Sequence, residues 1–133
     1  MSKDEQFLRN MAREFEEGFN SGDPDRIMRF YGDTYVDVNL RNPVQTKVER
    51  REYYARVMER PGIRLSVKPE DVVIRGDLAF IRGTIILTQA GPDPKEAKQS
   101  ELRYLEIAER VSDGSWRVIW GMDGPVQEYT PGG

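Results

Sequence analysis

The first twenty residues carry apolar side chains at helical spacing, with charged side chains between them. The apolar residues recur at intervals of three and four, with Glu and Arg between them; they are Phe7, Leu8, Met11, Phe15 and Phe19. This spacing predicts an amphipathic helix from Lys3 to Asn20.

Start and stop signals predict two further helices. Asp23 is an expected N-cap, and Pro24 follows it at the first helical position, where the missing N–H of proline costs nothing. We expect Gly32 to end this helix and its buried face to comprise Ile27, Phe30 and Tyr31. Thr46 predicts the start of a third helix, which the pair Pro61–Gly62 ends.

The stretch DTYVDVNLR, residues 33–41, alternates between two faces and predicts a strand from Thr34 to Arg41. One face carries Tyr35, Asp37, Asn39 and Arg41. That polar face either meets bulk water, as in an ordinary half-buried strand, or faces a cavity. In the second case these residues are the beginning of a site.

Beyond Gly62 the period changes from helical to two, which predicts four strands at 64–75, 78–89, about 99–111 and 115–123. Pro69 interrupts the first of them, so we expect an edge strand or a bulged one. In the last, strict alternation predicts one shared face for Trp116, Val118, Trp120 and Met122.

Helices followed by a strongly curved sheet predict an α+β fold. We expect a cone-shaped, curved antiparallel or mixed sheet wrapped around the three helices of the N-terminal half. Residues 1–133 have the size of one domain, and we expect residues 1–3 and 125–133 to be flexible ends.

Composition narrows the chemistry mainly through two absences. The chain contains no Cys and no His, which excludes serine–histidine and cysteine–histidine catalysis and removes the commonest metal ligands. Acid–base chemistry must therefore use Asp, Glu, Tyr, Lys or an activated water, with a carboxyl pKa raised by burial as the expected device. We expect no metal and no cofactor.

Charge patterning narrows the partners. The formal net charge is −3, and acidic and basic residues are interleaved without a basic stripe, so nucleic acid is not an expected partner. The charged N-terminus resembles no signal peptide, and no apolar run is long enough to span a bilayer. We therefore expect no membrane association and a cytoplasmic location.

Three strings of the sequence carry a family resemblance: FNSGDPDRIMRFYGDTYVDVN at 19–39, GDLAFIRGT at 76–84 and ELRYLEIAERVSDGSWRV at 101–118. In this order and spacing they resemble the nuclear-transport-factor-2-like superfamily, in particular its SnoaL-like and calcium/calmodulin-kinase association-domain-like branch. The resemblance implies a cone-shaped α+β barrel, a pocket for a small-molecule ligand between sheet and helices, and a homodimer through the outer face of the sheet.

Two members of that superfamily suggest roles for individual residues. Similarity to ketosteroid isomerase places Asn39 at its catalytic base and Phe15 at its helix-1 tyrosine, so isomerisation by that mechanism is not expected, because an amide cannot remove a proton. Limonene epoxide hydrolase is the closer analogy, since it activates water with Asn, Tyr and an Asp-Arg-Asp relay. Here Asn39 would orient a water, while Glu101, Arg103 and Asp123 are candidates for the relay.

These observations give a set of candidate site residues. The catalytic candidates are Asp37, Asn39 and Asp123, and the ligand-binding candidates are Phe15, Tyr35, Tyr54, Arg82, Glu101 and Arg103. Arg82 interrupts an apolar strand, and a buried Arg needs a carboxylate partner, for which Asp37 or Glu101 are candidates. Alternatively, Glu101 and Arg103 form cross-strand ion pairs on an exposed sheet, and Asp123 caps the turn before Gly124.

Two functions from different classes remain open. The first is a pocket protein that binds a small, mostly hydrophobic molecule and uses carboxylates for water activation or proton transfer, with its status as an enzyme undecided. The second is a non-catalytic association domain, in which the sheet face with Trp116 and Trp120 forms a dimer and side chains fill the cone.

Overall fold

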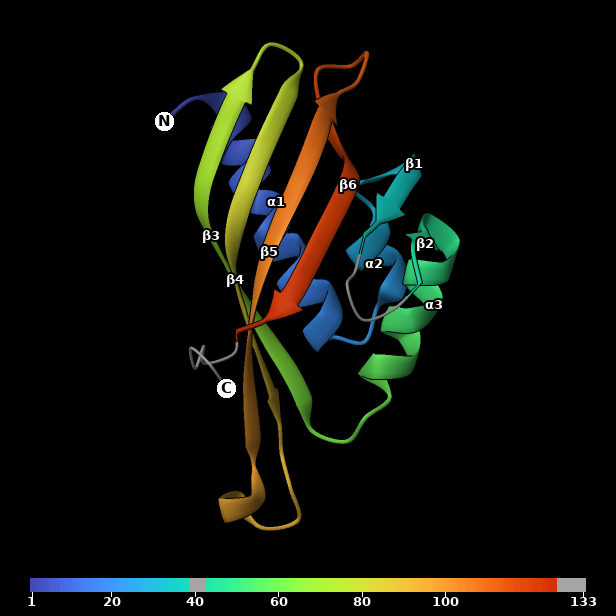
Figure 1. Cartoon of the computed structure of the whole chain (residues 1–133), viewed down its shortest axis with the longest axis vertical. Helices are drawn as coiled ribbons and strands as arrows, with labels where there is room; N and C mark the ends of the chain where they lie inside the picture. Colours follow the sequence, from blue (N-terminus) through green and yellow to red (C-terminus); the bar gives the residue numbers. More distant parts are fainter. Residues whose placement is uncertain (39–42, 127–133) are drawn as a thin grey trace, which may run out of the picture.

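The computed structural model describes residues 1–38 and 43–126 and places helices on one face of a six-stranded sheet (Figure 1). The described helices are α1 (Lys3–Asn20), α2 (Pro24–Met28), α3 (Lys47–Met58) and the short 3-10 helix η1 (Pro94–Glu96). The strands are β1 (Tyr31–Asp37), β2 (Gln45–Thr46), β3 (Ile63–Arg75), β4 (Leu78–Gln89), β5 (Lys98–Arg110) and β6 (Trp116–Pro125). The α+β fold class predicted from the sequence is confirmed.

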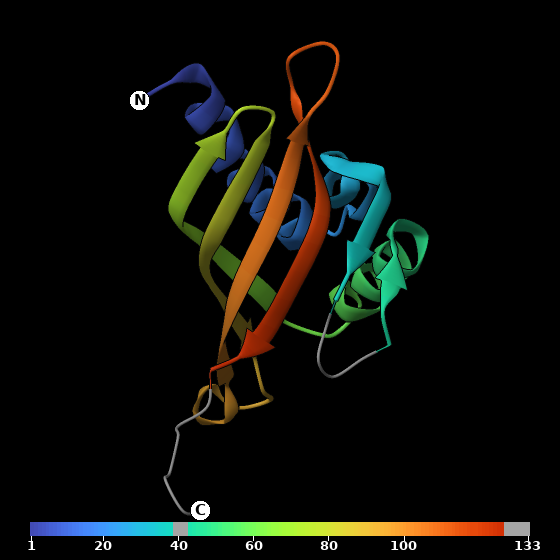
Figure 2. The same cartoon turned by 45° about the horizontal axis from the view of Figure 1, so that its top comes forward.

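The sheet is mixed and strongly curved. Its strand order is β2-β1-β6-β5-β4-β3, in which β1 and β6 run parallel and all other neighbours run antiparallel. The sheet curls around α1, while α2 and α3 lie beside β1 and complete the cone (Figure 2). The ends of β4 and β5 continue beyond this body as a hairpin that carries η1 at its tip (Figure 1).

The helix starts follow the predicted caps. The Asp23 side chain accepts a hydrogen bond from the Arg26 amide at the start of α2, and Thr46 forms a capping box with Glu49 at the start of α3. The predicted end of α2 is wrong, because the helix stops at Met28 and Tyr31 already belongs to β1. Pairing of Tyr31 with Val118 on β6 fixes Tyr31 in the sheet.

Strand β3 confirms the expectation drawn from its proline. It is the edge of the sheet, and its register with β4 shifts between Pro69 and Asp71. A bulge at this point accommodates the residue that cannot donate a ladder hydrogen bond.

Strand β6 departs from the strict alternation expected of it. Trp116 and Val118 are buried, but Trp120 and Met122 are exposed, so the four residues do not share one face. The cause is a register shift in the pairing with β5, where Ile107 lies opposite Trp120 and Ala108 lies opposite Val118. The extra residue, Ile119, reverses the alternation, turning Gly121 and Asp123 toward the helices.

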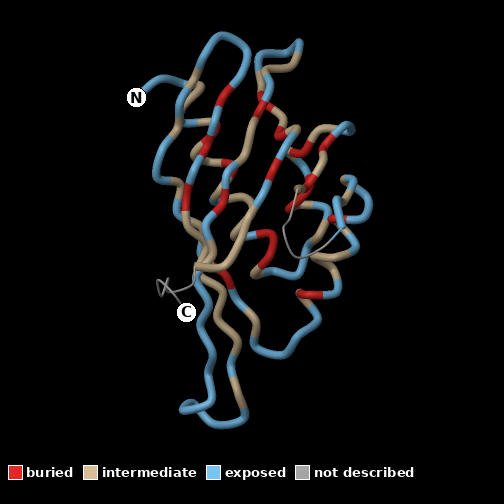
Figure 3. The backbone as a smooth tube through the Cα atoms, in the orientation of Figure 1, coloured by how far each residue is buried: buried red, intermediate tan, exposed pale blue. Residues whose placement is uncertain are grey.

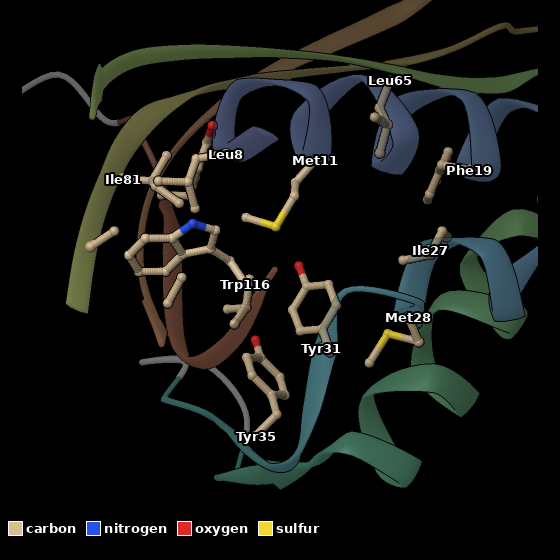
Figure 4. Close-up of a cluster of buried hydrophobic side chains, with 14 of the residues drawn as sticks. Leu8, Met11, Phe19, Ile27, Met28, Tyr31, Tyr35, Leu65, Ile81 and Trp116 are labelled. Carbon is tan, nitrogen blue, oxygen red and sulfur yellow. The ribbon is translucent and has the colours of Figure 1, made fainter. Parts of the chain in front are cut away.

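The core lies between α1 and the concave face of the sheet. Buried positions concentrate in this body, whereas the β4–β5 hairpin is largely exposed (Figure 3). In the core, Tyr31 and Tyr35 of β1 belong to the same cluster of buried side chains as Met11 of α1 and Trp116 of β6 (Figure 4). Among the described residues, no helix is both long and apolar enough to cross a membrane.

Candidate functional site

A cavity of about 50 Å³ lies between α1 and the concave face of the sheet. At roughly 10–15 Å³ for each water, this space holds a few water molecules or the head of a small ligand. Its wall is mostly apolar and aromatic, with a few polar groups. The residues that line it include Met11, Phe15, Phe30, Tyr31, Tyr35, Asp37, Tyr54, Ile81, Tyr104, Glu106, Val118, Gly121, Met122 and Asp123.

The first polar group is an Asp-Arg-Asp cluster assembled from three elements. Asp37 ends β1, Asp123 lies on β6, and Arg50 projects from α3. Arg50 Nε lies 3.2 Å from Asp37 Oδ2, and Arg50 Nη2 donates a hydrogen bond of 3.2 Å to Asp123 Oδ2. The Arg50 and Asp37 residues are each only 2% exposed. Such a pair is stable only because each charge has its partner.

Arg50 is held in place by further contacts. Its Nη1 donates to Gln45 Oε1 at 3.1 Å, and its guanidinium lies 4.5 Å from the ring centre of Tyr53 and 4.7 Å from that of Tyr54. Cation–π contacts with two rings stabilise a desolvated guanidinium. Arg50 itself does not line the cavity but pairs with Asp37 and Asp123, which do.

One carboxylate oxygen of Asp37 lacks a hydrogen-bond partner within the part of the chain that the structure describes. Its Oδ2 accepts a hydrogen bond of 2.9 Å from the Tyr35 hydroxyl, whereas its buried Oδ1 has no hydrogen-bond partner among the described residues. A buried acceptor left unpaired is costly and calls for an explanation, of which a bound molecule is one. Asp37 lines the cavity.

The second polar group is Glu106 on β5, which accepts a hydrogen bond of 2.9 Å from the Tyr31 hydroxyl. Burial raises the pKa of Glu106 to about 7; the Tyr31 hydrogen bond opposes this shift, and the Asp123 and Asp37 carboxylates add to it. Glu106 is therefore close to half-protonated at neutral pH. Glu106 is partly exposed, which is consistent with its place in the cavity wall.

The tyrosines around these carboxylates stay protonated. Burial, the largest cause, raises the pKa of Tyr31, Tyr35 and Tyr54 above its ordinary value. The rings of Tyr31 and Tyr35 meet edge to face with 4.6 Å between centres, so the two carboxylate groups are joined through an aromatic pair. Burial also raises the pKa of Asp123; Arg50 opposes that shift and Asp37 adds to it.

Gly121 on β6 makes room for this arrangement. A Cβ at this position would lie 2.6 Å from the Tyr35 hydroxyl oxygen. Glycine therefore lets the Tyr35 ring cross the β6 backbone and reach Asp37.

The structure brings some of the predicted site residues together in the cavity wall. These are Asp37, Asp123, Phe15, Tyr35 and Tyr54. The face of β1 that carries Tyr35 and Asp37 thus faces a cavity. Asn39 and Arg41 lie outside the described residues.

Three other predicted site residues point away from the cavity. Arg82, Glu101 and Arg103 are all exposed. On β4 the buried positions are Ala79, Ile81 and Gly83, so Arg82 faces outward, where it pairs with Asp71 and Glu70 rather than with Asp37 or Glu101.

Alternation along the strand also explains which side chains of β5 face the cavity and which are exposed. Tyr104 and Ala108 of β5 are buried and Glu106 faces the cavity, which leaves Glu101 and Arg103 on the opposite, exposed face.

The candidate site residues that the sequence prediction did not include are Arg50, Glu106, Tyr31 and Tyr104. Alternation along β5 was a usable signal for Tyr104 and Glu106 once Ala108 is placed in the core. No comparable signal marks Arg50, because α3 carries charged residues on all sides. Within residues 1–38 and 43–126, no three acidic side chains gather in a way that could hold a metal ion.

Comparisons with known proteins agree with this fold. The SnoaL-like domain family matches residues 12–119, which confirms the SnoaL-like resemblance seen in the sequence. No curated protein matches the chain.

Solved structures with a similar fold share little sequence with the chain. A ketosteroid isomerase-like protein from Erwinia carotovora atroseptica is 19% identical with a TM-score of 0.77, covering 96% of this chain and 100% of that one. An NTF2-like protein with a cystatin-like fold from Novosphingobium aromaticivorans is 13% identical with a TM-score of 0.82, covering 96% and 84%. At these identities the similarity shows the fold alone.

Proposed function

We propose that this chain, which belongs to the SnoaL-like domain family, binds a small, mostly apolar molecule in its cavity and acts on it by proton transfer or water activation. The observation that carries this proposal is the convergence of two buried carboxylate groups, Glu106 and the Asp37–Arg50–Asp123 cluster, on one aromatic-lined cavity. An apolar pocket with a few convergent polar groups is the usual form of a small-molecule site.

In this proposal Glu106 is the group that exchanges a proton with the ligand. A general base or acid works best when its pKa lies near the working pH, and the pKa of Glu106 is raised to about 7 by burial. The hydrogen bond from Tyr31 fixes the carboxyl orientation. Glu106 therefore takes or gives a proton at neutral pH without a histidine.

The Asp37–Arg50–Asp123 cluster positions a water or the polar end of the ligand. Asp37 lines the cavity, and its buried Oδ1 has no hydrogen-bond partner among the described residues, while Arg50 holds Asp37 and Asp123 in place and compensates their charge. The arrangement is similar to the Asp-Arg-Asp relay suggested by the epoxide hydrolase resemblance. Its arginine is Arg50 from α3 rather than Arg103, and Asn39 remains a candidate for orienting the water.

Fragment binding followed by NMR tests the proposal. Small apolar molecules with one polar group, including epoxides, lactones and ketones, are expected to shift the amide signals of cavity residues such as Tyr31 and Tyr104. Glu106→Gln and Asp37→Asn should abolish turnover of any fragment that reacts, with the fold intact by circular dichroism. Glu101→Gln is the matched control, because Glu101 lies on the same strand and faces solvent.

A failure of the whole fragment set would contradict the proposal. If no fragment perturbs the cavity residues, the space between α1 and the sheet is a packing void. If Glu101→Gln impairs turnover as much as Glu106→Gln does, the cavity is not where the reaction takes place.

A second candidate function, homodimer formation, rests on the outer face of the sheet. Phe80, Leu105, Trp120 and Met122 are all exposed there, and a shallow groove of about 180 Å³ is lined by Val38, Leu105, Ile107, Trp120, Gly121 and Met122. A contiguous exposed apolar patch is typical of an interaction surface. The predicted homodimer would bury these side chains.

Light scattering decides between monomer and dimer. We expect a dimer at micromolar concentration and a monomer after Trp120→Asp, because an unpaired charge would then be buried in the interface. A wild-type monomer at this concentration would contradict the association function. It would leave the cavity proposal untouched.

A further inference from the structure

The carboxylates that line the cavity, Asp37, Glu106 and Asp123, offer hydrogen-bond acceptors. Asp37 Oδ1 is unpaired among the described residues, and Glu106 receives only the Tyr31 hydroxyl among the hydrogen bonds observed there. The hydroxyls of Tyr31 and Tyr35 already donate to these carboxylates, so their oxygens can only accept. A ligand that satisfies these carboxylates and the two hydroxyls must bring donors.

The charge at the cavity surface has the same sign. Asp37, Glu106 and Asp123 line the cavity, whereas no Lys or Arg among the described residues does so. Arg50, which pairs with Asp37 and Asp123, is not itself among the residues that line the cavity. A carboxylate or phosphate placed here would meet like charges in a poorly solvated space.

The remaining wall suits a cation. Aromatic rings from α1, α2–β1, α3 and β5 surround the same space, contributed by Phe15, Phe30, Tyr31, Tyr35, Tyr54 and Tyr104. The faces of such rings attract a desolvated cation, and carboxylates beside them add charge-assisted hydrogen bonds. One guanidinium in this protein, Arg50, is already stabilised in this way by Tyr53 and Tyr54.

From the unpaired Asp37 Oδ1, the acidic wall and the aromatic lining, we infer that the cavity takes a small ligand whose buried polar end is a protonated amine. The inference rests on the proposed function, because it names the ligand class of the same cavity. An ammonium group supplies up to three donors and one positive charge. It would lie between the carboxylates of Asp37 and Glu106, with its apolar part against Phe15, Phe30 and Ile81.

The protonation state of Glu106 responds to the charge of the ligand head. An ammonium group beside its carboxyl favours the ionised form, because opposite charges at short range stabilise one another. A neutral or anionic ligand does not provide this stabilisation. The chemistry of the ligand head therefore decides the protonation state of Glu106 in the complex.

Three probes with one carbon skeleton test the inference: 3-methylbutylamine, 3-methyl-1-butanol and 3-methylbutanoate. They present a cation, a neutral hydroxyl and an anion, and their binding to the full chain is measured at pH 7.5 by amide NMR titration. We expect the amine to bind about tenfold tighter than the alcohol or more, as one charge-assisted hydrogen bond allows. The carboxylate is expected not to saturate.

Substitutions show which carboxylates cause the preference for the amine over the alcohol. Glu106→Gln keeps an acceptor for Tyr31 but removes the charge, and it should bring amine and alcohol to similar affinity; Asp37→Asn, a second and independent variant, should reduce the preference in the same direction. Glu101→Gln should leave the preference intact, because Glu101 is exposed on the other face of β5. Circular dichroism confirms that each variant is folded.

The outcomes separate the inference from the function on which it rests. If the alcohol or the carboxylate binds as tightly as the amine, the amine inference is overturned while the cavity remains a ligand site. If the preference survives both Glu106→Gln and Asp37→Asn, the amine binds elsewhere and the inference fails. If neither these probes nor the neutral fragments reach the cavity, the proposed function fails as well.

Discussion

Two arginines of this protein have the same kind of partners and opposite surroundings. Arg50 lies between Asp37 and Asp123 inside the cone, and Arg82 lies between Glu70 and Asp71 on its outside. The Arg50 side chain is 3% exposed, whereas that of Arg82 is 55% exposed. The sequence suggested Arg82 for the site, whereas in the structure the arginine that pairs with carboxylates of the cavity wall is Arg50.

Burial makes the difference between the two clusters. In water, an ion pair gains little free energy, because solvent screens the charges and long side chains lose entropy when fixed. Inside the cone the charges of Arg50, Asp37 and Asp123 have lost most of their solvent, so each depends on the others. A cluster of charges that is costly to bury and lies beside a cavity is a better functional candidate than a cluster that lies on the exposed face of a strand.

Breaking the inner cluster is expected to have the largest effect. Arg50→Met removes the cation but keeps much of the apolar stem, leaving two carboxylates near one another without compensation. We expect a loss of roughly 3–5 kcal/mol in the free energy of unfolding, as for other buried pairs deprived of one partner. Urea denaturation measures it; a loss below about 1 kcal/mol, the size of a surface pair, would contradict the burial of this cluster.

The next effect concerns Glu106 and depends on pH. Its folded pKa of about 7 lies above the ordinary value of 4.5, so the folded state keeps a proton that the unfolded chain releases as pH rises. The free energy of unfolding of the wild type therefore decreases as pH rises from 4.5 to about 7. Glu106→Gln has no carboxyl group at this position and does not show this decrease. The variant should gain roughly 3 kcal/mol over wild type above pH 7, and this gain should vanish below pH 4.5.

Thermal and urea denaturation at several pH values check this prediction. Glu101→Gln, on the same strand, controls for the substitution itself. A difference between wild type and Glu106→Gln that is constant from pH 4 to pH 8 would show that Glu106 does not carry a raised pKa.

A smaller effect is expected where β6 passes the Tyr35 ring. Gly121→Ala places a Cβ 2.6 Å from the present position of the Tyr35 hydroxyl oxygen, so Tyr35 must move and its hydrogen bond to Asp37 weakens. We expect a destabilisation of roughly 1–3 kcal/mol, typical of overpacking. Gly124→Ala is the matched control, because a Cβ there meets no heavy atom within 4 Å; equal effects of both substitutions would refute the steric account.

The smallest effect completes the comparison of the two arginines. Arg82→Met removes an exposed cation from Glu70 and Asp71 and should change stability by about 1 kcal/mol or less. It should also leave ligand binding unchanged, because Arg82 faces away from the cavity. Denaturation and fragment titration alongside Arg50→Met measure both quantities, and a loss equal to that of Arg50→Met would remove the distinction drawn between the two clusters.

Local patterns predicted most of the fold because local physics decides most of it. The span of α1, the Asp23 and Thr46 caps and the bulge at Pro69 all follow from preferences of a few neighbouring residues. The end of α2 was missed because pairing of Tyr31 with β6 is a long-range effect. The separation of Trp120 from Trp116 was missed because one extra residue in β6 reverses the alternation.

The site was predicted less completely, for related reasons. Asp37 and Tyr35 follow from alternation along β1, but the choice between Glu101 and Glu106 depends on which face of β5 turns inward. Arg50 is one charged residue among several on α3, and only the packing of α3 against β1 singles it out. Burial is set by tertiary structure, and burial is what separates these side chains from their exposed counterparts.

The central claim is that the inner face holds a carboxyl group poised near neutral pH beside a ligand cavity. Titration of the Glu106 side-chain carboxyl by ¹³C NMR, assigned with Glu106→Gln, measures this most directly. We expect a midpoint of about 7, moving downward when an amine ligand is present. A midpoint near the ordinary 4.5 would mean that water reaches Glu106 freely, and the cavity would then lack the acid–base group on which the proposed function depends.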